Sequence, residues 1–443
     1  MLNLTYFKDH FKKLQDSAPD SPFVQFRAEN FRNLDRIGLP TKRNEDWKYT
    51  AINELFDNNY RFGPEATEAS SAVADISAVK IPGHLQANEI VFLNGSFVPE
   101  LSSIRSSPEQ LIVLPLLEAA TGDFKNIVSE YLGCSNPYFK DGIHALNSSF
   151  IHGGVFIQVT KGQRLSHPIY IYYLTDTQLY PVLSQPRSLL YIGEGAKACL
   201  VETHHTLGGS EGFTNQVMEV VTAGNSIFEY YKIQDDVTNA SQVSSTHIRQ
   251  ISSSYLHAVT VSLGGGLIRN NLNVVMDAAG NEAHLFGLYM LDGKTHVDNH
   301  TLVNHAQPNC LSNELYKGVL AGQSTGVFNG KIMVRPDAQK TNAYQTNKNI
   351  LLSDGATVNS KPQLEIFADD VKCSHGCTVG QLDKDAFFYL RARGISKQDA
   401  QQLLISAFAT DVLEQIKPGY LRDYVKQLVE NHLTGNENHV NKG

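Results

Sequence analysis

The feature that most limits the fold of this chain is a long series of short apolar runs between about Gly154 and Val371, separated by glycines. Alternating runs of this kind predict β-strands. Roughly two hundred residues of such strands are too many for one ordinary sandwich, so we expect a coiled solenoid of strands. The pattern alone also leaves a pair of sandwiches or a barrel open. Examples of the runs are Val155-Phe-Ile-Gln-Val, Ile169-Tyr-Ile-Tyr-Tyr, Ile227-Phe-Glu-Tyr-Tyr and Leu364-Glu-Ile-Phe-Ala.

Helical spacing replaces the strand pattern at both ends of the chain. Near the N-terminus, between Asn3 and about Phe56, the apolar residues Phe7, Phe11 and Leu14 recur at helical intervals. Near the C-terminus, Asp383 is placed to cap a helix that ends at Gly394, and Ser396 begins a capping box. We therefore expect a mainly β chain in three parts: a mainly helical region at 1–150, a β core at 151–382 and a helical region at 383–443.

Three smaller features of the N-terminal region are also predicted. A tight hairpin is expected at Asn94-Gly95, because this dipeptide favours two-residue turns. Helices are expected around Gln110–Ala120 and Phe124–Leu132, and a surface connection over Glu65–Ala78, which is rich in Ala, Ser and Glu.

Charge and cysteine content narrow the function classes. The net charge is -8 without a long basic run, which argues against a nucleic-acid partner. No apolar stretch reaches the roughly 18 residues of a membrane-spanning helix, so no membrane partner is expected. The five cysteines are sparse, and residues 1–13 lack the apolar core of a secretion signal. These features predict reduced thiols and a cytoplasmic protein.

The sharpest candidate for chemistry is Cys373-Ser-His375-Gly-Cys377. In an extended strand Cys373 and His375 face the same side about 6.8 Å apart, close enough to approach one iron or one cluster. Cys377 would lie about 13 Å from Cys373 unless Gly376 bends the strand. Iron–sulfur clusters usually take four ligands, so the rest would have to come from another chain. A buried thiol with a hydrogen-bonded histidine is the alternative.

Other polar groups carry weaker signals. His296, Asp298 and His300 share one face if they lie in a strand, and His305 follows; ordinary polar contacts are favoured there over a metal site. Asp298 or Glu365 could serve a hydrolase, but neither has a placed catalytic partner. Two glycine–lysine segments, at 287–295 and 326–331, fail the phosphate-loop spacing and open no helix, so no ATP site is expected. Cys134, Cys199 and Cys310 stand singly and are expected in core or incidental positions.

Several segments along nearly the whole chain resemble the SufD branch of the SufB/SufD family, which belongs to the SUF iron–sulfur cluster assembly system. The segments that carry the resemblance are Asn44-Glu-Asp-Trp-Lys-Tyr-Thr, His296 to His305, Leu315-Tyr-Lys-Gly, Val327-Phe-Asn-Gly-Lys-Ile, Gln345-Thr-Asn-Lys-Asn, Leu364 to Gly376 and Leu390-Arg-Ala-Arg-Gly-Ile.

The resemblance implies a non-catalytic scaffold subunit built on a right-handed parallel β-helix. It implies pairing with SufB through the β-helix and docking of the SufC ATPase on the C-terminal helices, with two SufC per pair. It further implies a role in iron acquisition, and a transient cluster or iron assembled at the interface with SufB. His375 matches the family's histidine implicated in assembly there, with Cys373 beside it.

The sequence leaves several alternatives. The family often has alanine where this chain has Cys377, so this cysteine is an extra ligand, a redox liability or neutral. A purely structural subunit and a β-helix hydrolase are alternative functions. Motion of SufC that opens the interface, pairing of two isolated chains through the open β-helix edge, and participation of a flavin are not decided by the sequence.

Overall fold

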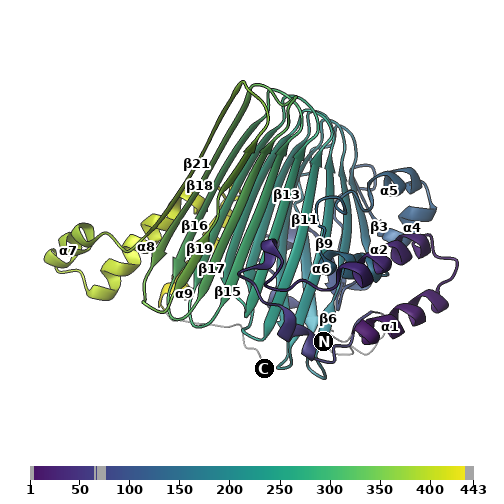
Figure 1. The fold of residues 1–443 in the computed structure, drawn as a ribbon, viewed down its shortest axis with the longest axis horizontal. Helices are drawn as coiled ribbons and strands as arrows, with labels where there is room; N and C mark the ends of the chain where they lie inside the picture. The colour runs from purple at the N-terminus through teal and green to yellow at the C-terminus, as the bar shows by residue number, and fades with distance from the viewer. Residues whose placement is uncertain (1–3, 64–65, 67–75, 435–443) are drawn as a thin grey trace.

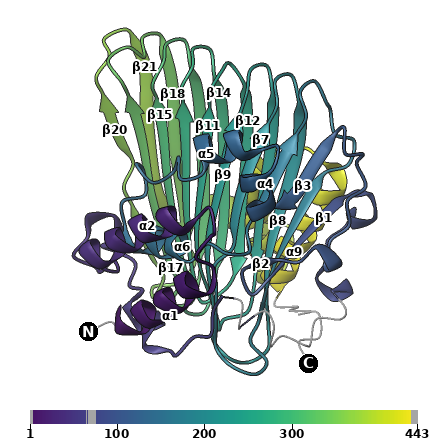
Figure 2. The same cartoon turned by 90° about the vertical axis from the view of Figure 1, so that its right-hand side faces the viewer.

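A solenoid of parallel strands forms the body of the molecule (Figures 1 and 2). The computed structural model describes residues 4–63, 66 and 76–434. Within them, strands alternate between a ten-stranded and an eleven-stranded sheet, and from β7 to β17 each strand pairs with the strand two positions later in the chain. The ten-stranded sheet, which we call sheet B, follows the order β2-β1-β5-β8-β10-β12-β14-β16-β18-β21; the other sheet, which we call sheet A, follows β19-β17-β15-β13-β11-β9-β7-β4-β3, with β6 and β20 beside it. The predicted mainly β solenoid with flanking helices is confirmed.

The strands have these bounds: β1 Asn88–Leu93, β2 Ser96–Phe97, β3 Leu111–Pro115, β4 Val155–Val159, β5 Ile169–Asp176, β6 Val182–Ser184, β7 Arg187–Ile192, β8 Lys197–Leu207, β9 Gly212–Thr222, β10 Ile227–Asp235, β11 Ala240–Gln250, β12 Tyr255–Gly264, β13 Leu267–Met276, β14 Glu282–Leu291, β15 His296–His305, β16 Leu311–Leu320, β17 Thr325–Val334, β18 Thr341–Leu351, β19 Thr357–Ser360, β20 Gln363–Ile366 and β21 Val371–Gly380. The α-helices are α1 Leu4–Ser17, α2 Val24–Ile37, α4 Leu116–Thr121, α5 Lys125–Tyr131, α6 Gly142–Ser149, α7 Lys384–Ala392, α8 Lys397–Leu413 and α9 Gly419–Thr434.

The interior between the two sheets is a continuous apolar core. Successive side chains of a strand point to opposite faces, so every second residue enters the interior. Buried residues from nearly every coil meet there, among them Ile157, Leu200, Val274 and Phe328. Tight corners join the strands. Several corners contain a residue in the left-handed conformation, such as Gly195, and glycine adopts this conformation at little cost.

The N-terminal helices cover the outer face of sheet A. Aromatic side chains of α1, including Phe7 and Phe11, pack with Phe150 and with the strand residue Phe213. The hairpin predicted at Asn94-Gly95 is confirmed, because β1 and β2 pair antiparallel and both turn residues have positive φ. The helix predicted over Gln110–Ala120 is wrong in its first half, where β3 pairs with β4 and only α4 is helical. Most of the predicted connection at 65–78 lies outside the described residues.

The C-terminal helices begin and end where the sequence predicts. The Asp383 carboxylate accepts hydrogen bonds from two backbone N–H groups of α7, and the Ser396 hydroxyl accepts one from Asp399 at the start of α8. Apolar residues of α8 and α9, such as Ile405, Val412 and Val425, pack on the outer face of sheet B. Helix α7 projects away from the solenoid (Figure 1).

Two further observations concern the cysteines and the helices. Each of the five cysteines is a free thiol, so no disulfide joins them. Among the described helices, none has the length and apolar character needed to cross a membrane.

Candidate functional site

The segment that carries Cys373, His375 and Cys377 is the last strand of the solenoid, β21. Among the described strands β21 pairs only with β18, parallel and in register from Thr341 opposite Val371 onward. Its other edge carries no strand of the described chain, which leaves a row of main-chain donors and acceptors free to pair with another chain. This open end of the solenoid, formed by β19, β20 and β21, is called the last coil below.

The three candidate residues all face the interior of the solenoid at this open end. Their register partners on β18 are Ala343, Gln345 and Asn347, which are buried inside the preceding coil. A parallel pair in register places partners on the same face of the sheet. The three side chains therefore lie over the core, and His375 and Cys377 are exposed because no described strand stacks on them.

The two thiols have different surroundings. Cys373 is partly covered by an apolar cluster that includes Ile332, Val334 and Ala343, and this burial raises the pKa of its thiol. A raised pKa keeps the sulfur protonated, and hence a weaker nucleophile, until a cation lowers it. The Cys377 side chain is exposed, and its Sγ donates a long hydrogen bond of 3.9 Å to Asn347 Oδ1.

These side chains do not make a complete metal site by themselves. No group of three or more His, Cys, Asp or Glu side chains in the described part of the chain could hold a metal ion. Strand spacing separates Cys373 from His375 by about 6.8 Å and from Cys377 by about 13 Å. The arrangement can offer one or two ligands to an ion that also binds groups from elsewhere.

His296, Asp298 and His300 share one face of β15, as expected, but they join two parts of the chain. Asp298 Oδ2 accepts a 2.7 Å hydrogen bond from Arg269 Nη1 and a short one from the Thr50 hydroxyl, while His300 Nε2 lies 3.0 Å from Asp298 Oδ1. Burial alone would raise the pKa of Asp298, but His300 and Arg269 outweigh it and hold the pKa below its usual range. The group anchors the N-terminal segment on sheet A.

Other sequence candidates occupy structural positions. His305 is buried in the interior, where its Nε2 lies 2.9 Å from the Ser312 hydroxyl. Glu365 forms an ion pair of 2.9 Å with Lys331. Burial raises the pKa of Cys134, Cys199 and Cys310. Both glycine–lysine segments lie in strands and a turn, and neither opens a helix.

Two interior residues next to the site were missed by the sequence analysis. Glu314 on β16 and Gln345 on β18 lie in register, and Gln345 Nε2 donates a 2.6 Å hydrogen bond to Glu314 Oε2. Burial raises the pKa of Glu314 to about 7. The signal that could have found them is the coil length, because Glu314, Gln345 and His375 recur about 30 residues apart.

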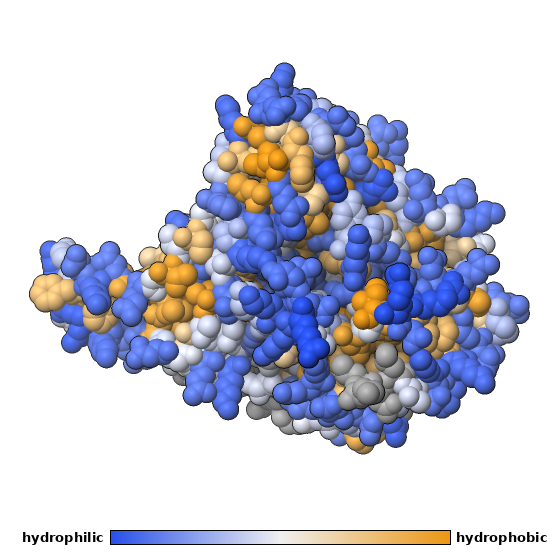
Figure 3. Space-filling view, in the orientation of Figure 1, coloured by the Kyte–Doolittle hydropathy of each residue, from blue (hydrophilic) through white to orange (hydrophobic). Residues whose placement is uncertain are grey.

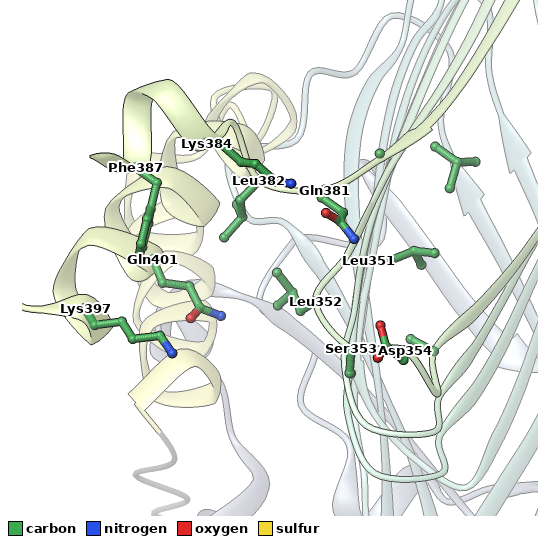
Figure 4. Close-up of a pocket in the computed structure, with 13 residues that line it drawn as sticks. Leu351, Leu352, Ser353, Asp354, Gln381, Leu382, Lys384, Phe387, Lys397 and Gln401 are labelled. Carbon is green, nitrogen blue, oxygen red and sulfur yellow. The ribbon is translucent and has the colours of Figure 1, made fainter. Parts of the chain in front are cut away.

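A separate cavity lies between the C-terminal helices and the far end of β21. Its volume is about 740 Å³, and residues of the turn after β18 face Phe387 of α7 and Gln401 of α8 across it (Figure 4). Nearby, Phe388, Tyr389 and Leu403 expose large apolar side chains. Apolar surface is also visible over the last strands of the solenoid (Figure 3).

Comparison with known proteins gives two matches that together cover most of the chain. Residues 173–408 match the family described as SUF system FeS cluster assembly, SufBD core domain, and residues 3–171 match the SufBD protein N-terminal region.

Individual relatives agree with these matches. The chain is 31% identical to the iron–sulfur cluster assembly SufBD family protein slr0076 of Synechocystis, over 93% of this chain and 91% of that protein. It is 30% identical to the iron–sulfur cluster assembly protein SufD of Escherichia coli, over 92% of each chain. It is also 30% identical to the chloroplastic protein ABCI7 of Arabidopsis thaliana, over 96% of this chain and 89% of that protein.

Proposed function

Since the chain belongs to the SufBD family of iron–sulfur cluster assembly proteins and is a homologue of SufD, we propose that it is a non-catalytic scaffold subunit. In this proposal its last coil pairs with the β-helix of SufB, and a cluster or its iron is assembled between the two chains as cargo. The C-terminal helices dock the SufC ATPase, and the subunit works in the cytoplasm.

The observation that carries the proposal is the position of the candidate ligands on an unpaired edge. Cys373 and His375 face the interior at the β21 end of sheet B, where no described strand covers that interior. A strand edge with free main-chain groups pairs readily with a second strand. A partner β-helix that continues the sheet would bring its own side chains opposite these two.

Incomplete ligation supports a second chain at the same place. A cluster usually takes four ligands. In this proposal the chain would supply Cys373 and His375, with Cys377 as a further candidate. Apolar side chains exposed around the last coil, such as Ile366, Phe367 and Val379, suit burial in an interface. Iron and sulfur would therefore meet at the junction of two subunits.

The C-terminal region supports a second docking surface. Helices α8 and α9 are fixed on sheet B, with Lys317 Nζ donating to the Phe408 carbonyl oxygen at 2.7 Å and to Asp411 Oδ2 at 2.6 Å. Helix α7 then exposes Phe388 and Tyr389 beside the 740 Å³ cavity. Large aromatic side chains of this kind are common anchors of protein interfaces. We assign this surface to SufC, which would supply the ATP chemistry.

The test is anaerobic reconstitution of the complex with SufB and SufC, supplied with ferrous iron and sulfide, with cluster formation followed by absorbance. The His375→Ala variant should lower the initial rate of cluster formation at least about tenfold. Ser374→Ala, whose side chain faces away from the interior on the same strand, is the matched control and should behave as wild type. Full assembly by a Cys373→Ser, His375→Ala, Cys377→Ser triple variant would instead support a purely structural subunit.

A further inference from the structure

A column of three polar residues leads from the buried interior to the open end of the solenoid. Glu314 on β16, Gln345 on β18 and His375 on β21 occupy register positions directly beside one another in sheet B. Glu314 is 4% exposed and Gln345 is 1% exposed, whereas His375 is exposed. Gln345 therefore lies between a buried carboxyl group and the candidate ligand.

The hydrogen bond to Glu314 fixes which way the Gln345 amide points. Gln345 Nε2 donates to Glu314 Oε2 at 2.6 Å, so the amide nitrogen faces the buried coil. Gln345 Oε1 is buried and has no hydrogen-bond partner among the described residues. A buried acceptor without a donor is unfavourable, so a donor at this position is favoured. The next side chain in the column is the His375 imidazole.

The opposite wall of the interior holds Gln345 in place. A Cβ atom built on Gly330 of β17 would overlap Gln345 Nε2 and would lie 2.6 Å from Phe328 Cζ. Only glycine leaves this space for the glutamine side chain. Glycine at this position thus serves the packing of Gln345.

We propose that Gln345 is a positioning residue for His375: when iron binds in the complex, the Oε1 that has no partner in the chain alone accepts a hydrogen bond from one ring N–H of the imidazole and turns the other ring nitrogen toward the open end. A neutral imidazole binds a metal through one nitrogen, and a hydrogen bond at the other nitrogen fixes the tautomer and the ring orientation. Glu314 acts indirectly, because it accepts the hydrogen bond that orients the Gln345 amide. This inference rests on the proposed role of His375 as a ligand of the iron cargo.

The experiment uses the complex with SufB and SufC and Co²⁺ as a spectroscopic probe of the site, titrated anaerobically. Loss of an outer hydrogen bond to a histidine ligand typically costs 10–100-fold in metal affinity. Gln345→Met keeps the shape of the side chain without its polar groups, and we expect it to weaken Co²⁺ binding by that factor.

Two further variants control for damage to the fold. Asn349→Leu alters a buried residue of the same strand that lies in register with Val379, not with a candidate ligand, and should stay within about threefold of wild type. Glu314→Leu frees the Gln345 amide to rotate, so it should weaken Co²⁺ binding even if Gln345→Met proves unstable.

The outcomes separate this inference from the proposed function. Weakening by His375→Ala, Gln345→Met and Glu314→Leu, with Asn349→Leu near wild type, supports both. Weakening by His375→Ala alone, with wild-type affinity in Gln345→Met and Glu314→Leu, overturns the positioning role and leaves the proposed function standing. Wild-type Co²⁺ affinity and spectrum in His375→Ala overturn both. Equal weakening by Asn349→Leu and Gln345→Met also overturns the positioning role.

Discussion

The Arg269 guanidinium lies 3.8 Å from the centre of the Trp47 ring, and this contact joins the N-terminal segment to the outer face of the solenoid. Trp47 is 1% exposed, and its indole N–H donates to Asp141 Oδ2 at 3.3 Å. Arg269 is also paired with Asp298. A cation packed on an aromatic face and paired with a carboxylate is well stabilised while all three groups are present.

Removal of the carboxylate should therefore destabilise the protein strongly. In Asp298→Ala the Arg269 guanidinium would stay buried without its charge partner, which typically costs about 3–5 kcal/mol. Urea unfolding of the full chain measures this loss. The control is Glu365→Ala, which breaks the partly exposed pair with Lys331 and should cost no more than about 1 kcal/mol. Equal losses in the two variants would contradict the assigned role of Asp298.

Stability should fall as the pH is lowered from about 6.5 to about 4, in part because of His305. Burial lowers the pKa of His305 to about 4, whereas an exposed histidine in the unfolded chain has a pKa of about 6.5. Between these two pH values His305 binds a proton in the unfolded chain but stays neutral in the folded protein. Lowering the pH therefore favours unfolding.

For His305 alone the difference amounts to about 3 kcal/mol over the window. His305→Gln should flatten the pH dependence of the unfolding free energy between pH 6.5 and 4 by roughly that amount. Urea unfolding at a series of pH values checks it. A variant as steep as wild type across this range would show that His305 is not the group that titrates.

Cys377 should be the most reactive thiol of the isolated chain. It is the exposed one of the five cysteines, whereas Cys373 is partly covered and has a raised pKa. Iodoacetamide at pH 7.5, followed by peptide mass spectrometry, should label Cys377 roughly tenfold faster than Cys373. Faster labelling of Cys373 would contradict the placement of the two thiols.

Binding of SufC should depend on the exposed aromatic side chains of α7. Phe388 is 73% exposed, so its replacement by alanine should leave the melting temperature unchanged. If Phe388 is an anchor of the interface, its loss should cost at least about 2 kcal/mol in SufC affinity measured by calorimetry. The control is Leu179→Ala. Leu179 is 74% exposed and lies between β5 and β6, far from α7 in the sequence, so its replacement should leave the SufC affinity unchanged. Wild-type affinity in Phe388→Ala would place the SufC surface elsewhere.

Local patterns predicted most of the fold. Strand alternation located the solenoid, and capping residues such as Asp383 and Ser396 located the C-terminal helices, because both signals depend on neighbours within a few residues. The prediction of a helix at Gln110–Ala120 was wrong over β3, because the continuous apolar run there is compatible with a buried strand as well as with a helix.

The candidate site was predicted only in part, for a physical reason. Cys373 and His375 lie two residues apart, so strand geometry alone placed them together. Glu314 and Gln345 meet across successive coils and are 31 residues apart in the sequence. The two-residue alternation of a strand shows which face a side chain lies on, but it does not show which residue of another strand it contacts. The anchoring of His296, Asp298 and His300 by Thr50 and Arg269 likewise depends on contacts between distant segments.

The central claim is that the last coil forms the junction with SufB, and amide hydrogen exchange tests it most directly. Exchange of residues 371–380 is compared in the chain alone, at a concentration where it is monomeric, and in complex with SufB. We predict that the amides of this strand that point away from β18 exchange at least about tenfold more slowly in the complex, because a partner strand would supply acceptors for their N–H groups. Residues 88–97, at the opposite edge of sheet B, should be unchanged. Unchanged exchange of residues 371–380 in a complex that is fully formed would contradict the account.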